Sequence, residues 1–416
     1  MRRRLIILGS TGSIGTQALA VVDHVNALHA RGESPLCLDV VGLAAGRNVR
    51  ILGEQSLRYP DARLAIAHSD VRDLAISEQG LGASFPGKLL RALHGQDSAL
   101  RLVREVECDL VLAAMVGSAG LPATLAAVEL GRDVALANKE TLVAAGALVT
   151  AAARTSGARL LPVDSEHSAI WQCLASLGYA AAPDPAPAAV TRVVLTASGG
   201  PFRTWPREKI RNATPADALR HPTWSMGRKV TVDSASLTNK ALEIIEAHWL
   251  FALPGEKIEP VVHPQSIVHA MVETRDGSVL AQMGAPDMRL PIQIALGYPN
   301  RVAPAAPRLA WAQMSRLEFE PVDRERFPAV DHAYRVLREG GTLGAVFNAA
   351  NEAAVHAFLR GGLPFGAIEA AVADALDALP RSEVSSLDDV LDAEARTRAH
   401  AEAFLSARYG RAPISH

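Results

Sequence analysis

The sequence predicts an α/β protein built from several domains, and three observations carry this prediction. Short apolar runs without alternation, typical of parallel strands buried on both faces, recur in the first part of the chain, with helical stripes between them. From about residue 327 onward helical patterns dominate, for example over 329–338 and 348–359. With 416 residues, 49% of them apolar, the chain is long enough for about two or three hydrophobic cores.

Charge and cysteine content exclude several classes of protein. A formal net charge of −2 provides no field that would attract a polyanion, so we expect no nucleic-acid partner. Cys37, Cys108 and Cys173 lie far apart and form no CxxC pair, which is typical of buried thiols in a reducing compartment. The apolar run 5–8 is too short for a signal peptide and no long apolar span follows, so we expect a cytoplasmic protein without membrane contact.

The N-terminal stretch RLIILGSTGSIGTQALAVV predicts a strand over 5–8, a glycine turn and then a helix. Gly9, Gly12 and Gly15 have GxxGxxG spacing within it. A glycine turn before a helix offers free backbone N–H groups and a favourable dipole to a pyrophosphate. This favours a Rossmann-like, dinucleotide-binding domain, and the alternative is a tight turn that only permits close packing.

The second strand, predicted over 38–43, indicates which dinucleotide binds. It is followed by Gly46, Arg47 and Asn48. An NAD site usually carries an acidic residue here, which binds the ribose 2′-hydroxyl. This chain has no acid at that place, and Arg47 would suit a 2′-phosphate, which favours NADP. Alternatively, Arg47 is a solvated loop charge.

Further strands are predicted near 110–115 and over 134–137. The second of these ends in Asn138, Lys139 and Glu140. Ligands of open parallel sheets lie beyond the carboxyl ends of the strands. We therefore expect these side chains near the nicotinamide and the substrate, unless Lys139 and Glu140 only form a surface ion pair.

The stretch LLPVDSEHSAIWQ places Asp164, Ser165 and Glu166 after the apolar run 159–163, where a helix begins. In one interpretation, Asp164 or Ser165 is the N-cap of the helix and Glu166 lies favourably in its first turn. A cap needs only one polar side chain, however. Carboxylate oxygens are also the preferred ligands of hard divalent cations. The local pattern leaves both interpretations open.

A second glycine turn follows the predicted strand in RVVLTASGGPFR. Ser198 and the backbone donors of this turn suit a phosphate, although such a turn can be purely structural. The stretch HPTWSMG has the composition of a mobile lid loop. We expect a short strand over 229–232 after it, with Asp233 or Ser234 capping a helix that runs over about 236–251.

This predicted helix carries Asn239, Lys240 and Glu243 in its first half, close to its positive end. The helix can present Asn239 and Lys240, together with Ser234, to an anionic phosphate and Glu243 to a metal ion. The alternative is a solvated ion pair between Lys240 and Glu243 at i, i+3.

Taken together, these features resemble the 1-deoxy-D-xylulose 5-phosphate reductoisomerase family of the non-mevalonate isoprenoid pathway. The matching stretches run in family order over about the first 300 residues; they are GSTGSIG, AGRNV, ALANKE, LLPVDSEHSAIWQ, ASGGPFR, HPTWSMGRKVTVDSASLTNKALEIIEAHWLF, HPQSIVH and GAPDMRLPI. A later stretch, FNAANEAAVHAFL, is similar to the terminal helical domain of this family.

The resemblance implies an NADPH- and metal-dependent reductoisomerase, an oxidoreductase with an intramolecular rearrangement. Such an enzyme cleaves and re-forms carbon–carbon bonds of 1-deoxy-D-xylulose 5-phosphate and reduces the branched aldehyde to 2-C-methyl-D-erythritol 4-phosphate. One Mn²⁺, Mg²⁺ or Co²⁺ would hold the C2 carbonyl and C3 hydroxyl oxygens. The resemblance also implies a homodimer formed through the middle domain. Two alternatives are a metal-free NADP-dependent sugar or semialdehyde dehydrogenase and a non-catalytic NADP sensor.

The resemblance implies a role for each site residue. The metal ligands, of which the two glutamates also bind substrate, would be Asp164, Glu166 and Glu243. The substrate would be held near its reacting carbons by Lys139, Ser165 and His221. The catalytic residues would be Lys139, His221 and the three metal ligands, whereas Ser165 would only bind the substrate. The phosphate would be bound by Ser198, Ser234, Asn239 and Lys240. The pocket would be covered and lined by Trp224, Met226, His269 and Met288. NADPH would be contacted by Thr11, Gly12, Ser13, Ile14, Gly46, Arg47, Asn48, Asn138, Glu140 and Gly227.

The predicted domain organisation follows from these stretches. We expect an NADPH-binding domain over 1–160 and an α+β catalytic domain with the metal site, substrate site and lid loop over 161–300. A Pro/Ala-rich linker over 301–326 then leads to a C-terminal helical domain over 327–416.

Overall fold

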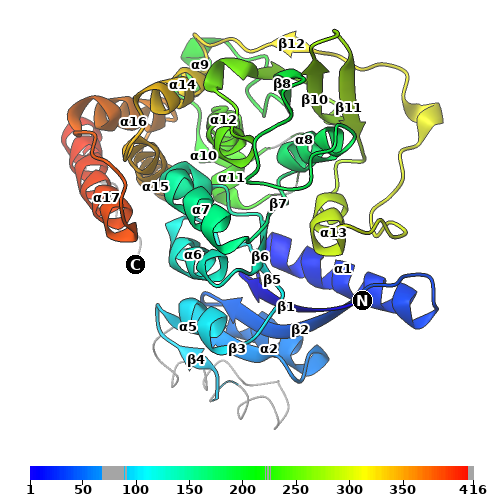
Figure 1. The fold of residues 1–416 in the computed structure, drawn as a ribbon. Helices are drawn as coiled ribbons and strands as arrows, with labels where there is room; N and C mark the ends of the chain where they lie inside the picture. The colour runs from blue at the N-terminus through cyan, green and yellow to red at the C-terminus, as the bar shows by residue number, and fades with distance from the viewer. Residues whose placement is uncertain (68–88, 90, 221, 223, 225, 411–416) are drawn as a thin grey trace. The chain divides into compact units, whose positions relative to one another are not determined.

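The structure is a computed structural model that describes residues 1–67, 89, 91–220, 222, 224 and 226–410 (Figure 1). The chain divides into two compact units whose segments alternate along the sequence. The first unit comprises Met1–Thr141, Ala151–Ser168 and Asp287–Arg308, and the second comprises Leu142–Thr150, Ala169–Pro286 and Leu309–His416. The domain boundaries expected at 160, 300 and 326 stay predictions.

The first unit contains a seven-stranded sheet in the order β4-β3-β2-β1-β5-β6-β7, and every strand pair in it is parallel. The strands are β1 (Arg2–Leu8), β2 (Cys37–Ala45), β3 (Arg63–Ile66), β4 (Leu93–His94), β5 (Leu110–Ala113), β6 (Asp133–Leu136) and β7 (Leu160–Pro162). Side chains 5–8 of β1 are fully buried, as the unalternated apolar run predicts. The expected Rossmann-like α/β architecture is confirmed.

Helices cover both faces of this sheet. They are α1 (Ser13–Ala30), α2 (Val49–Arg58), α5 (Ser98–Glu105), the 3₁₀ turn η1 (Ser118–Gly120), α6 (Leu121–Glu129), the start of α7 (Glu140–Ser156) and α13 (Arg289–Gly297). Right-handed connections place α1 and α2 on one face and α5 and α6 on the other. Helix α13 returns from far along the sequence to pack on α1, β6 and β7 (Figure 1).

The amino-terminal edge of the sheet is stabilised by a buried charge cluster. Asp133, at the start of β6, accepts hydrogen bonds from Arg3 at 3.0 Å and from Arg159 at 2.5 Å. Arg3 is 6% exposed and also donates to the Tyr298 carbonyl after α13. Burial lowers the pKa of Arg3, and the neighbouring carboxylate of Asp133 stabilises the buried charge.

We expect Asp133→Asn to lower the free energy of unfolding by about 3 kcal/mol, because it leaves the buried Arg3 charge without a counter-charge. NADPH affinity should not change, because ligands bind at the opposite, carboxyl edge of the sheet. Asp39→Asn is a matched control, since Asp39 pairs with the exposed Arg2 on the neighbouring strand. Chemical denaturation of both variants measures the difference, and equal destabilisation would contradict the interpretation.

The second unit contains a mixed five-stranded sheet in the order β11-β10-β8-β9-β12. Its strands are β8 (Val190–Ala197), β9 (Ile258–Val262), β10 (Val268–Thr274), β11 (Val279–Met283) and β12 (Glu320–Pro321). The pair β8 and β9 is parallel and the other pairs are antiparallel. The turn at 275–277 joins β10 to β11.

Two helices of the second unit, α11 (Arg228–Ala235) and α12 (Thr238–Phe251), carry three of the four predicted phosphate ligands. The other helices of this unit are α8 (Ser165–Ala175), which begins in the first unit, α9 (Arg207–Arg211), α10 (Pro215–Ala218), α14 (Ala329–Glu339), α15 (Leu343–Arg360), α16 (Gly366–Ala378) and α17 (Leu387–Tyr409), with 3₁₀ turns η2 (Gly255–Lys257) and η3 (Trp311–Gln313). Helices α14 to α17 confirm the expected helical region at the C-terminus (Figure 1). Among the described helices, none has the length and hydropathy needed to cross a membrane.

The strand predicted over 229–232 is wrong, because these residues form the first half of helix α11. The β-branched residues in KVTV favour a strand only weakly, and tertiary contacts override that preference. Within the helix Lys229 forms an i, i+4 ion pair with Asp233 at 2.9 Å, and both side chains are buried.

Candidate active site

The predicted site residues fall into two sets, one in each unit. The first unit carries the glycine turn, the 46–48 loop, Asn138 to Glu140, Asp164 to Glu166 and Met288. The second carries Ser198, Trp224, Met226, Gly227, Ser234, Asn239, Lys240, Glu243 and His269. His221 lies outside the described residues.

The glycines of the first turn serve two different purposes. Gly9 has a φ of +83°, and a Cβ there would lie 2.4 Å from the Ala114 carbonyl oxygen. A Cβ on Gly15 would lie 2.3 Å from the Gly9 carbonyl oxygen, so both positions require glycine for packing. A Cβ on Gly12 would meet nothing in the described structure closer than 3.4 Å, so packing does not explain this glycine.

Gly12 is the exposed N-cap of α1, and it supplies no side-chain cap. The first turn of α1 also contains no acidic side chain. Its N–H groups and the positive end of the helix dipole therefore favour an anion that approaches the backbone closely. Thr11, Ser13 and Ile14 are exposed or half-buried beside Gly12. These residues fit the pyrophosphate of a dinucleotide.

The loop after β2 carries three exposed residues, Gly46, Arg47 and Asn48. Asn48 is the N-cap of α2, where its side chain accepts a hydrogen bond from the Ile51 N–H at 3.1 Å. Arg47 follows the carboxyl end of a strand next to β1, where the adenosine ribose of a dinucleotide lies in Rossmann folds. This placement suits the predicted contact with a 2′-phosphate.

The residues after β6 are more deeply embedded than a surface ion pair would be. Asn138 and Glu140 are 3% and 6% exposed. The Asn138 amide donates to the Gly117 carbonyl and to Glu140 Oε2, both at 3.1 Å, and its oxygen accepts from the Thr141 hydroxyl at 2.6 Å. Asn138 thus joins the loops after β5 and β6. The surface pair between Lys139 and Glu140 is wrong, because Lys139 pairs with Asp164.

The end of β7 carries the acid pair, which stands at the start of a helix. Helix α8 begins at Ser165, whose N–H donates to Asp164 Oδ1 at 3.0 Å. The other oxygen of Asp164 lies 2.5 Å from Lys139 Nζ. One oxygen of Asp164 and one of Glu166 lie within 4.8 Å of each other. At this separation both carboxylates are available to the same divalent cation.

In the second unit, the turn after β8 is packed against the end of α11. Gly200 has a φ of +63°, and a Cβ there would lie 2.5 Å from the Ser234 carbonyl oxygen. Glycine at this position therefore brings Ser198 and Ser234 into neighbouring backbone segments. The Ser198 hydroxyl accepts a hydrogen bond from the Gly200 N–H at 3.2 Å. From the sequence, this turn could either bind phosphate or be purely structural. In the structure it lies beside Ser234, a predicted phosphate ligand.

Helix α12 starts three residues after α11, and its first turns hold the other polar groups. Lys240 and Glu243 are 2% and 0% exposed, and they form an ion pair. The Asn239 amide donates to Glu243 Oε1 at 2.5 Å. The solvated Lys240–Glu243 pair is wrong, because such a pair keeps both charges in water. Burying a cation and a carboxylate here is costly and is typical of a functional site.

The remaining predicted residues lie on different elements. His269, in β10, is 5% exposed, and its ring centroid is 6.3 Å from that of the half-buried Trp224. Burial lowers the pKa of His269 to about 4, so the ring is neutral at physiological pH. Gly227 is the exposed N-cap of α11, and Met226 precedes it. Met288 is the half-buried N-cap of α13.

Two polar residues near the site were missed in the sequence. The Thr141 hydroxyl donates a hydrogen bond to Asn138. The only sequence signal for this contact is a threonine three residues after an asparagine at the start of a helix, and this signal is weak. Asp233 was considered only as a cap, although its spacing of four from Lys229 is a helical pairing signal.

The chain matches three family models. They are described as 1-deoxy-D-xylulose 5-phosphate reductoisomerase over residues 5–146, the C-terminal domain of that enzyme over 160–251 and the DXP reductoisomerase C-terminal domain over 283–400. The reductoisomerase of Symbiobacterium thermophilum is 50% identical over 381 residues, covering 91% of this chain and 92% of the relative. That of Chloroherpeton thalassium is 44% identical over 396 residues, covering 95% and 96%.

Solved structures agree with these matches. The 1-deoxy-D-xylulose 5-phosphate reductoisomerase of Zymomonas mobilis in complex with NADPH is 40% identical, with a TM-score of 0.84 and coverage of 98% of this chain and 100% of that chain. A DOX-P reductoisomerase in complex with NADPH, fosmidomycin and magnesium is 34% identical, with a TM-score of 0.86 and coverage of 98% and 99%. The chain therefore belongs to the 1-deoxy-D-xylulose 5-phosphate reductoisomerase family.

Proposed function

We propose that the predicted site residues of both units take part in the reaction of this family. The chain converts 1-deoxy-D-xylulose 5-phosphate to 2-C-methyl-D-erythritol 4-phosphate in isoprenoid biosynthesis, with NADPH and a divalent cation. The observation that carries the site assignment is the pair of carboxylates at the end of β7, Asp164 and Glu166, within reach of one cation.

Asp164, Glu166 and Glu243 are the residues that we propose to hold the cation. Three carboxylates are a donor set that suits Mg²⁺ or Mn²⁺, because hard divalent cations prefer oxygen ligands. When bound, the cation supplies Lewis-acid and template chemistry at the C2 and C3 oxygens of the substrate. Lys139 lies against Asp164 at 2.5 Å and carries a positive charge to the same place. We propose that Lys139 and Ser165, with His221, hold the reacting part of the substrate.

The phosphate end of the substrate is assigned to Ser198, Ser234, Asn239 and Lys240. This assignment is supported by the packing of the Gly200 turn on α11 and by the buried cation of Lys240 at the start of α12. Binding energy from the phosphate can position the reacting carbons and close the lid loop, here represented by Trp224 and Met226. His269 and Met288 are assigned to the pocket lining.

The cofactor is assigned to Thr11, Gly12, Ser13, Ile14, Gly46, Arg47, Asn48, Asn138, Glu140 and Gly227. NADPH supplies the hydride, and the protein orients it. The open Gly12 and the uncapped first turn of α1 support the pyrophosphate contact. The visible contacts of Asn138 are with the protein, so we assign it the additional task of joining the loops beneath the nicotinamide.

We expect Arg47→Ala to reduce the preference for NADPH over NADH by about tenfold, because one charge-assisted contact with the 2′-phosphate is lost. Arg50→Ala is the matched control: Arg50 is also exposed, one turn further on, and pairs with Glu54. Steady-state kinetics with both cofactors measure the ratio. An unchanged ratio in Arg47→Ala would mean that the 2′-phosphate is bound elsewhere.

NADPH oxidation with 1-deoxy-D-xylulose 5-phosphate, first with Mn²⁺ and then with excess chelator, tests the proposed function. We expect oxidation with the metal and none after chelation. Activity that survives the chelator would favour a metal-free sugar dehydrogenase. No oxidation by a folded protein that still binds NADPH would contradict the substrate assignment.

We further propose that the protein acts as a homodimer in the cytoplasm. Exposed apolar side chains in the segment before β12 support the dimer; they are Trp311, Leu317 and Phe319, which are 68%, 37% and 45% exposed. The three cysteines are free thiols, which suits a reducing compartment. Light scattering of the wild type and of Trp311→Glu tests the dimer, because a charge in the interface should yield monomers.

A further inference from the structure

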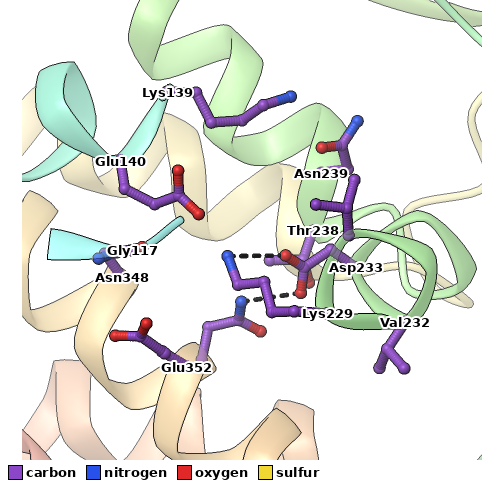
Figure 2. Close-up of polar contacts among 12 residues, drawn as sticks. Gly117, Lys139, Glu140, Lys229, Val232, Asp233, Thr238, Asn239, Asn348 and Glu352 are labelled. Atoms are coloured by element: carbon purple, nitrogen blue, oxygen red, sulfur yellow. Dashed lines mark hydrogen bonds and ion pairs between the residues drawn. The ribbon is translucent and has the colours of Figure 1, made fainter. Parts of the chain in front are cut away.

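The carboxylate of Asp233 connects α11 to the C-terminal helices. Asp233 is 1% exposed, and each of its oxygens faces one donor. Lys229 Nζ lies 2.9 Å from Oδ2, and Asn351 Nδ2 donates to Oδ1 at 2.9 Å. In Figure 2 a dashed line joins Lys229 to the carboxylate of Asp233. Lys229 belongs to α11 itself, whereas Asn351 lies on α15, so the amide is the donor that comes from outside the helix.

Helix α15 is itself held in place by contacts with α17 and α7. Glu352, the neighbour of Asn351, accepts a hydrogen bond from Arg398 of α17 at 2.5 Å. Arg398 also contacts Glu394 one turn earlier on α17, at 3.4 Å. At the start of α15, a Cβ on Gly344 would lie 2.0 Å from the Val143 carbonyl oxygen, so this end is packed against α7. Asn351 therefore projects from a helix that is anchored on two other elements.

The position of α11 matters because of what it carries at its two ends. Gly227 is its N-cap, and Ser234, directly after Asp233, lies in its last turn. Ser234 is 8% exposed and its carbonyl touches the Gly200 turn that carries Ser198. A shift of α11 would therefore move Ser234 relative to Ser198, and both are assigned to the phosphate.

We propose that Asn351 is a positioning residue for the phosphate end of the substrate, acting through Asp233 and α11. The inference rests on the phosphate assignment of Ser234 in the proposed function. Without the amide, Asp233 would keep one buried oxygen lacking its donor, which is costly for a carboxylate. The helix can relieve that cost by moving toward water, and such a movement displaces Ser234. A geometric change of this kind weakens phosphate binding without removing any phosphate ligand.

Binding of inorganic phosphate to the NADPH-loaded protein, measured by calorimetry, is the test. We expect Asn351→Leu to raise the dissociation constant of phosphate about tenfold. With 1-deoxy-D-xylulose 5-phosphate, KM should rise about tenfold while kcat stays within about threefold, because the reacting end is unchanged. NADPH affinity should stay within about twofold, since the first unit carries nine of the ten predicted cofactor contacts.

Two further variants separate positioning from general destabilisation. Thr397→Val removes a buried hydrogen bond within α17, from the Thr397 hydroxyl to the Ala393 carbonyl, and should leave phosphate affinity unchanged. Asn351→Asp should weaken phosphate binding by more than tenfold, because two carboxylates then face each other. The double variant Asp233→Asn, Asn351→Asp places the amide at position 233 and the carboxylate at position 351. The hydrogen bond can then form in the opposite direction, and phosphate binding should recover.

The outcomes distinguish this inference from the proposed function. Equal phosphate affinity in Asn351→Leu and the wild type, or no recovery in the double variant, would overturn the positioning role. Absence of phosphate binding in the wild type would overturn it as well. A third outcome is that Asn351→Leu binds phosphate more weakly than the wild type, while the wild type does not turn over the substrate. This result would support the inference and contradict the proposed function.

Discussion

Glu243→Gln is expected to lower kcat roughly a thousandfold while NADPH affinity stays nearly intact. Lewis-acid stabilisation by a bound cation is worth several kcal/mol, and every 1.4 kcal/mol is a factor of ten in rate. Glutamine keeps the shape of the side chain and can still accept the hydrogen bond from Asn239, but it removes the negative charge that attracts a cation. Titration of Mn²⁺, followed by calorimetry, should show weaker binding in parallel with the loss of rate.

Glu394→Gln is the control for this substitution. Glu394 is 3% exposed, lies on α17 in the same unit and also pairs with a basic side chain. The Glu394→Gln substitution should leave both kcat and the Mn²⁺ affinity unchanged. The general effect of removing a buried carboxylate is measured in this variant as a change in unfolding temperature. Loss of NADPH affinity with normal turnover in Glu243→Gln would contradict the role assigned to Glu243.

The first unit could be predicted from sequence because its signals are local. The run 5–8 is buried on both faces, and Gly9 and Gly15 after it stand where packing requires a glycine. Strands β6 and β7 end at Leu136 and Pro162, and after one more apolar residue each is followed by the polar residues at the carboxyl edge of the sheet. In a parallel sheet, position along the strand decides which edge a residue occupies, so the sequence alone places these side chains.

Helix α11 was predicted as a strand because the contacts that stabilise it are not local. The carboxylate of Asp233 is satisfied by Asn351, which lies 118 positions further along the chain. No pattern within 229–232 reports that partner, and the β-branched residues there point the other way. The i, i+4 relation of Lys229 and Asp233 was the available signal for a helix.

The burial of the Lys240–Glu243 pair could not be predicted either. Spacing shows that two side chains can meet on a helix, but not whether that face of the helix meets water. Helix α12 is buried on nearly all sides, with Glu243 and Glu246 both 0% exposed. The structure therefore separates a weak surface pair from a costly buried one, and only the second demands a functional explanation.

Gly200→Ala is expected to lower kcat/KM for the phosphorylated substrate roughly a hundredfold. The φ of +63° makes any Cβ unfavourable by roughly 1–2 kcal/mol, and this Cβ would also overlap the Ser234 carbonyl oxygen at 2.5 Å. Either the turn or α11 must then move, which separates Ser198 from Ser234. Misplacement by about 1 Å can cost about a hundredfold in rate. NADPH affinity should not change, because the glycine turn after β1 is untouched.

Gly277→Ala isolates the steric part of this effect. Gly277 lies in the turn between β10 and β11, with a φ of +84° and nothing within 4 Å of an added Cβ. Both variants carry the same kind of backbone strain, so both should unfold at a lower temperature than the wild type. Only Gly200→Ala pushes on α11, so only it should raise KM and weaken the binding of inorganic phosphate. If both variants kept the wild-type KM, the contact of the Gly200 turn with Ser234 would have no part in holding the phosphate, and Ser198 would have to bind it independently of α11.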